Sequence, residues 1–143
     1  MATSDLAEVM EQDHRALEAW VQGDPEPKKR LYSRRDDATL ANPLGPPARG
    51  WNQVEAALDR AAAQLRDGEV TRFERVSGYA TADLAYIVEF ERTRVKVGGA
   101  DERQPVSLRV TTVFRREDAG WKVVHRHADP ITSPRPIEST VEQ

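Results

Sequence analysis

The chain contains no cysteine, which excludes disulfides, thiolate catalysis and metal sites built on cysteine. It also lacks any apolar run near the roughly 20 residues that a membrane-spanning helix needs. Its first residues show no basic segment followed by an apolar stretch, so we expect no signal peptide. These absences together predict a cytoplasmic protein with no membrane partner.

A concentrated basic face is also missing. The net charge is −3, and acidic and basic residues are interspersed along the chain, which argues against a nucleic-acid partner. The basic clusters at residues 28–30 and 34–35 are interpreted as solvated helix ends. No glycine-rich phosphate loop, Ser-His-Asp motif or nucleotide fingerprint is present, so we expect no cofactor.

The hydrophobic pattern is typical of an α+β domain, with helices first and strands after them. It predicts one domain over residues 1–130 and an irregular tail over residues 131–143, where prolines recur. The expected helices cover residues 5–22, a short segment that begins at 24–25, and residues 51–65. The expected strands cover residues 38–41, 69–79, 84–97, 105–116 and 121–128, and residues 42–50 read as a loop.

The end of the domain reads as a β-hairpin, with strands at 110–116 and 121–129 around a turn at 118–120. Together with residues 36–45, this hairpin resembles the SnoaL-like branch of the nuclear transport factor 2-like superfamily, which includes ketosteroid isomerases. The resemblance implies a cystatin-like cone, with three N-terminal helices packed on a curved antiparallel sheet around a pocket. It also implies a homodimer through the sheet.

The resemblance further implies a carboxylate base immediately before a Pro-x-Gly segment, and here that position is Asn42. An amide cannot accept a proton at neutral pH. The oxyanion donors of the isomerases would fall at Ala16 and Thr112, which cannot replace a tyrosine and an aspartic acid. We therefore expect that the protein is not a true ketosteroid isomerase. Asn42 either orients a ligand or caps the turn before Pro43.

Strand alternation predicts which side chains enter the pocket. We expect Arg126, Thr112, Tyr86 and Asn42 to converge on one cavity beneath the long helix, with Trp20 in its wall. There Arg126 would favour a ligand carboxylate, although an arginine in solvent and aromatics in the core are the ordinary alternatives.

The opposite register of the last strand would bring His125 and His127 into the cavity, where a histidine could serve as the base. The spacing of His125, His127 and Asp129 also fits a metal site on one strand face. A pair of histidines at an interface explains the same spacing, and we expect no metal.

The strand residues Leu84, Tyr86, Val88 and Phe90 form the more apolar set of their strand and are expected to face the helices. The opposite sheet face would still carry hydrophobic side chains and is predicted to form the homodimer interface. The residues expected there are Ile87, Val113, Trp121 and Val123, with Glu89, Glu91, Arg109, His125 and His127 nearby.

These observations favour a protein of uncharacterised function that binds an unidentified small molecule in an apolar pocket. One alternative is a cofactor-independent isomerase, cyclase or hydratase that uses a pocket histidine. The other is a purely structural dimerisation module. A shifted pKa within the pocket would favour the enzyme, and a cone filled by its own side chains would favour the structural module.

Overall fold

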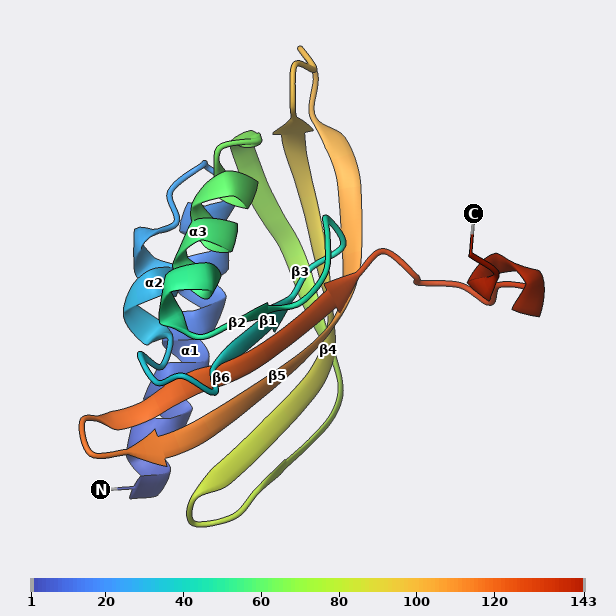
Figure 1. Cartoon of the computed structure of the whole chain (residues 1–143). Coiled ribbons are helices and arrows are strands. Elements are labelled where there is room, and N and C mark those ends of the chain that lie inside the picture. Colours follow the sequence, from blue (N-terminus) through green and yellow to red (C-terminus); the bar gives the residue numbers. More distant parts are fainter. Residues whose placement is uncertain (1, 143) are drawn as a thin grey trace.

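Three helices lie against one side of a curved sheet (Figure 1). The computed structural model describes residues 2–142, with side chains from residue 5 onward. The helices are α1 (Ala2–Trp20), α2 (Glu26–Leu31) and α3 (Trp51–Ala62). Among the described residues, no helix combines the length and hydropathy that crossing a membrane would require.

The sheet has six strands in the order β2-β1-β6-β5-β4-β3. The strands are β1 (Thr39–Ala41), β2 (Ala48–Arg49), β3 (Leu65–Ala80), β4 (Leu84–Val97), β5 (Gln104–Glu117) and β6 (Gly120–Asp129). Only β1 and β6 pair in parallel among these strands. The predicted α+β cone of cystatin-like type is confirmed. The prediction missed β2 inside the loop at 42–50, because two residues are too short to show alternation.

Bulges and a close contact bend the sheet around α1. β3 shifts its register against β4 at three places, and each shift increases the local twist. At Gly68, β3 approaches the end of α1, and the Gly68 N–H donates to the Val21 carbonyl at 2.9 Å. A Cβ atom at Gly68 would lie 2.5 Å from that carbonyl oxygen, so the approach requires glycine.

The inner face of β4 is the more charged one. Ala85, Ile87, Glu89 and Glu91 point toward the helices and are buried, whereas Tyr86 on the opposite face is 39% exposed. The predicted orientation of β4 is therefore wrong. The apolar set faces outward because the two glutamates on the inner face find partners in His14 and Arg126, so hydrophobicity alone selects the wrong side.

The last hairpin contains a bulge that sequence alternation does not reveal. Val113 pairs with His125 and Phe114 pairs with Val123, so Val124 is the extra residue. Trp121 and Val123 consequently join the core, together with Ile87, rather than the outer face that was predicted for all three. After β6, residues 130–142 leave the sheet and include a 3-10 helix at Ile137–Thr140 (Figure 1).

Candidate functional site

A cavity of about 480 Å³ lies between the helices and the inner face of the sheet. Most of its wall is apolar and comes from elements far apart in sequence. The wall residues include Leu17, Leu40, Leu58, Val95 and Leu108. Leu44 and Val97, which are 69% and 41% exposed, also line it. The cone is therefore hollow, with room for an apolar molecule.

The polar part of the cavity wall contains a buried ion pair between Arg126 and Glu91. The guanidinium donates to both carboxylate oxygens, at 2.8 and 2.7 Å. Burial raises the pKa of Glu91, but Arg126, with smaller contributions from Lys28 and His14, more than offsets this, and the pKa lies below its ordinary value. Arg126 is thus neutralised by the protein itself and is not free to select a ligand carboxylate.

Lys28 is the second cation at this end of the cavity. Lys28 is only 4% exposed, and its Nζ atom lies 5.5 Å from the centre of the Trp20 ring. Among the described side chains, no carboxylate oxygen lies within 4.0 Å of this amine. Burial, followed by repulsion from Arg126, lowers the pKa of Lys28 to about 8. The amine is therefore desolvated and lacks a direct anionic partner.

The neighbouring Lys29 has the opposite environment. It forms ion pairs with Glu26, Glu55 and Asp59 at 3.0–3.1 Å. These contacts raise the pKa of Lys29 above its ordinary value. Successive residues of a helix point about 100° apart, so α2 directs one lysine inward and the next toward the surface. The interpretation of residues 28–30 as a solvated helix end is therefore wrong for Lys28.

Asp13 of α1 is a further buried acid in this charge cluster, at 7% exposure. Burial raises the pKa of Asp13, and Lys28 and Arg126 offset only part of that effect. A carboxyl group in this position retains its proton more readily than one in water. Asp13 lies three residues after Met10 and four before Leu17, within the apolar stripe of the helix, and this position is a sequence signal that was missed.

A separate buried pair joins α1 to β4. His14 Nε2 lies 3.1 and 3.0 Å from the two carboxylate oxygens of Glu89, and the imidazole stacks on Phe73 at 3.6 Å. The hydrogen bond with Glu89 raises the pKa of His14 despite partial burial. Because neither residue lines the cavity, this pair fastens α1 to the sheet.

Three of the predicted pocket residues line the cavity, namely Trp20, Asn42 and Arg126. Asn42 Oδ1 accepts a hydrogen bond from the Leu44 N–H at 2.9 Å, which is the turn-capping alternative. Thr112 points inward opposite Arg126 but does not line the cavity, and its buried hydroxyl has no partner within residues 5–142. The prediction is wrong for Tyr86, which lies on the outer sheet face.

Both histidines of β6 lie outside the cavity, so the reversed register is excluded. His125 Nδ1 and Thr39 Oγ1 share a hydrogen bond at 2.8 Å, and His127 Nε2 lies 2.9 Å from Asp129 Oδ2. Within the described part of the chain, no group of three or more His, Asp or Glu side chains is arranged to hold a metal ion.

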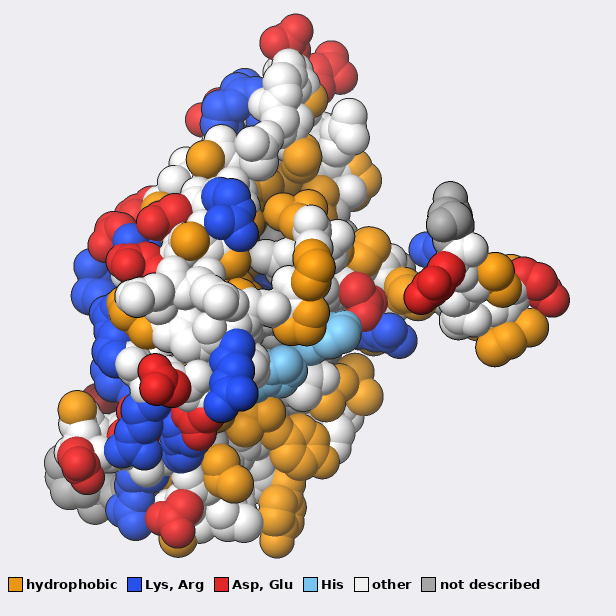
Figure 2. Space-filling model, in the orientation of Figure 1, with side chains coloured by type: hydrophobic (Ala, Val, Ile, Leu, Met, Phe, Trp, Pro, Cys, Tyr) orange, Lys and Arg blue, Asp and Glu red, His pale blue; other side chains and the backbone are white. Residues whose placement is uncertain are grey.

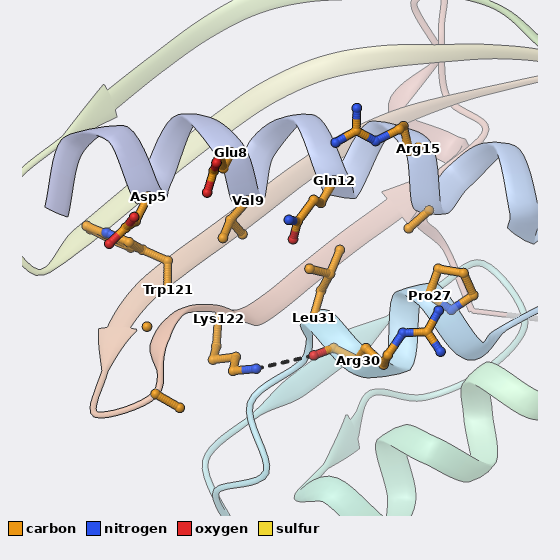
Figure 3. A pocket seen from close by; sticks show the side chains of 13 residues that line it. Asp5, Glu8, Val9, Gln12, Arg15, Pro27, Arg30, Leu31, Trp121 and Lys122 are labelled. Atoms are coloured by element: carbon orange, nitrogen blue, oxygen red, sulfur yellow. Dashed lines mark hydrogen bonds between the residues drawn. The ribbon is translucent and has the colours of Figure 1, made fainter. Parts of the chain in front are cut away.

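A second hollow, a groove of about 700 Å³, lies between α1, α2 and the turn before β6 (Figure 3). Glu8, Gln12, Arg15 and Arg30 on its rim are exposed. Lys122 Nζ donates to the Arg30 carbonyl at 3.3 Å across one end. This groove has a mixed polar and apolar lining with exposed charged side chains, whereas the inner cavity combines apolar walls with a desolvated amine. We therefore place the candidate site in the inner cavity.

Comparisons with known proteins agree with this architecture. A nuclear transport factor 2-like superfamily protein from Salmonella enterica serovar Typhimurium is 18% identical with a TM-score of 0.77, covering 95% of this chain and 97% of that chain. A ketosteroid isomerase-like protein from Erwinia carotovora atroseptica is 19% identical with a TM-score of 0.72, covering 91% and 98%. A nuclear transport factor 2-like protein of unknown function from Pseudomonas putida is 23% identical with a TM-score of 0.68, covering 100% and 96%.

At these identities the solved structures establish the fold alone. No curated protein sequence matches the chain. The family model of the SnoaL-like domain matches residues 9–132, which span the helices, the sheet and the cavity between them. The chain belongs to the SnoaL-like domain family.

Proposed function

We propose that this protein binds a small, largely apolar organic molecule with one acceptor oxygen, a carboxylate or carbonyl oxygen, placed against Lys28. The observation that carries the proposal is the Lys28 amine, which lines an apolar cavity and has no carboxylate within 4.0 Å among the described side chains. A buried ammonium group without a partner is costly. A ligand oxygen would supply the missing partner.

The shape and lining of the cavity support the same ligand class. Its volume of about 480 Å³ lies within the usual range of small-molecule sites, and apolar side chains form most of the wall. Since Glu91 already neutralises Arg126, Lys28 is the cation that we assign to the ligand. The purely structural alternative gains no support, because a module of that kind would have a cone filled by its own side chains.

The cavity does not reproduce a ketosteroid isomerase site. Asn42 lines the cavity, and the side-chain oxygen of Asn42 already accepts a hydrogen bond from the Leu44 N–H. A cofactor-independent enzyme is the second candidate function, with a different base from the histidine that the sequence suggested. The lowered pKa of Lys28, which lines the cavity, favours this amine, whereas the histidines lie outside the cavity.

We also propose a homodimer through the outer sheet face. The outer-sheet patch consists of Tyr79, Leu84, Tyr86, Val88 and Val113. Tyr86 pairs with Tyr79 on one side and with Val113 on the other, and Leu84 and Val88 share its face of β4. Tyr79 is 68% exposed and Leu84 is 48% exposed. Figure 2 shows hydrophobic side chains gathered beside the histidines of β6. An apolar sheet face of this kind commonly marks a protein–protein contact.

Thermal unfolding with a matched ligand series tests the binding proposal. Octanoate, octanal and octanol share one apolar chain and differ in the terminal oxygen. We expect octanoate and octanal to raise the Tm more than octanol does. Lys28→Met should remove this preference, whereas Lys29→Met should retain it.

Ala61→Trp would fill the cavity and is expected to abolish binding of all three compounds, because Ala61 lines the wall. A folded Ala61→Trp variant that binds octanoate normally would place the ligand elsewhere. Equal responses to octanoate and octanol in the unmodified protein would contradict the role of Lys28.

A further inference from the structure

We infer that the Lys28 amine is a nucleophile that forms a Schiff base with an aldehyde or ketone held in the cavity. The inference deepens the proposed function and rests on it, because the carbonyl compound must first occupy the apolar cavity. It assigns a covalent reaction to Lys28, which the sequence suggested was part of a solvated basic cluster.

The placement of Lys28 meets the first requirement of such a reaction, which is an accessible but desolvated amine. Lys28 is only 4% exposed, yet it lines a cavity of about 480 Å³. Trp20 lines the same cavity, and its ring lies 5.5 Å from Nζ, where it forms a wall beside the amine. A lysine in a hydrophobic pocket is activated because burial disfavours the ammonium form.

The charges around Lys28 meet the second requirement, because the amine must lose its proton to attack. Arg126 lies close enough to repel the ammonium form, and Glu91 is held by Arg126 through two hydrogen bonds. The surface carboxylates of Glu26, Glu55 and Asp59 all bind Lys29 instead. Asp13, Glu91 and Glu89 favour the ammonium form of Lys28, but burial and Arg126 outweigh them.

The reaction balances with groups that are present. The uncharged amine forms a C–N bond to the carbonyl carbon, and the oxygen gains the proton that the nitrogen loses, giving a carbinolamine. Proton transfer to the carbinolamine hydroxyl then releases water as the C=N bond forms, and the nitrogen gives up its second proton. Solvent supplies the proton for the hydroxyl and takes up the second proton of the nitrogen, so no further co-reactant is needed.

A purely structural lysine is the competing interpretation. In that case Lys28 would only cover the Trp20 ring as a cation, and its reactivity would not exceed that of other lysines. The chain has four lysines, at positions 28, 29, 96 and 122, so each can be followed separately. Lys29 is the matched internal control, because it occupies the same helix with three carboxylates around it.

Reductive trapping tests the inference. The full-length protein is treated at pH 7.5 with octanal and sodium cyanoborohydride, and the site of each octyl group is mapped by peptide mass spectrometry. We expect Lys28 to be modified about tenfold or more faster than Lys29, since a larger fraction of its amine is uncharged. Excess octanoate should slow the modification of Lys28 and leave the surface lysines unaffected.

The outcomes separate the two proposals. If octanal raises the Tm but Lys28 is modified no faster than Lys29, the covalent inference is wrong and the binding proposal stands. If neither octanal nor octanoate binds and Lys28 stays unmodified, both fail. Lys28→Met should lose the fast modification, and Lys29→Met should retain it.

Discussion

Lys28 and Lys29 are consecutive residues of α2, yet the first faces an apolar cavity and the second binds three surface carboxylates. Their pKa values move in opposite directions, downward to about 8 for Lys28 and upward for Lys29. A fold that buries a lysine without a direct anionic partner gives up stability. This loss of stability is explained if a bound ligand supplies the missing partner of Lys28.

Replacing Lys28 by methionine should stabilise the ligand-free protein by about 2–3 kcal/mol at pH 7, because the buried charge disappears. The folded-state pKa of Lys28 lies below the unfolded value of 10.5, so the unfolded chain binds more protons between about pH 8 and 10.5. The stability of the unmodified protein therefore rises through this window, and the advantage of Lys28→Met shrinks. Urea unfolding at several pH values measures the difference. An advantage that does not depend on pH would contradict this explanation.

The buried pair of Arg126 and Glu91 predicts a strongly coupled double-mutant cycle. Arg126→Leu should cost about 3–5 kcal/mol, because Glu91 would remain buried without its partner. The double variant Arg126→Leu/Glu91→Leu should recover most of the loss in chemical denaturation. Additive losses would show that the two side chains act independently.

The contact between His14 and Glu89 predicts pH-dependent stability. The folded-state pKa of His14 is raised above 6.5, so the protonated form is favoured in the folded protein. This contribution is fully present below pH 6.5 and is lost as the pH rises through the folded-state value. His14→Gln should therefore be most destabilising near pH 6 and less so at pH 8. Arg15→Gln, which removes only an exposed ion pair with Glu11, serves as the control.

The outer-sheet patch predicts which substitutions disrupt a dimer. Tyr86→Asp should produce a folded monomer, because a charge would replace an apolar contact between subunits. Val123→Asp is expected to unfold the protein instead, since Val123 is 2% exposed in the core of a single chain. Leu44→Asp changes an exposed residue of the β1–β2 loop, outside the outer-sheet patch, and should leave the molecular mass unchanged. Light scattering at micromolar concentration checks each variant, and a monomeric unmodified protein would refute the dimer.

The amide at Asn42 predicts that the protein does not isomerise a Δ5-3-ketosteroid. No carboxylate occupies the position of the base, and Ala16 and Thr112 cannot supply the oxyanion donors. Asn42→Asp should gain little activity for the same reason. A spectrophotometric assay for the conjugated product decides the question. Turnover by the unmodified protein clearly above the solution rate would refute this assignment.

The sequence predicted the fold because its helix and strand periods are regular, and after the third helix the pattern is that of strands alone. It placed Arg126 on the inner face correctly, since alternation holds from the bulge to the end of β6. It failed at Trp121 and Val123 because a bulge cannot be read from alternation. It failed at Tyr86 because the inner face of β4 carries Glu89 and Glu91, whose partners come from other elements.

The central group of the site was missed for a related reason. Lys28 stands in a basic cluster at the end of a short helix, and only the packing of α2 against the sheet shows which of the cluster's side chains is buried. Asp13 carried a weak signal through its place in the apolar stripe of α1. The sequence thus predicts where the cavity lies, whereas only the tertiary contacts show which charged side chains are buried there.

The most direct measurement is an NMR titration of the protein with isotope-labelled lysine, because each of the four lysines can be followed separately. In the free protein, we predict that Lys28 loses its proton near pH 8, while Lys29 stays protonated beyond its ordinary range. Addition of octanoate should shift the Lys28 signal saturably and leave the Lys29 signal in place. A Lys28 signal that titrates together with Lys29 and does not respond to octanoate would contradict the assignment of this amine to the ligand.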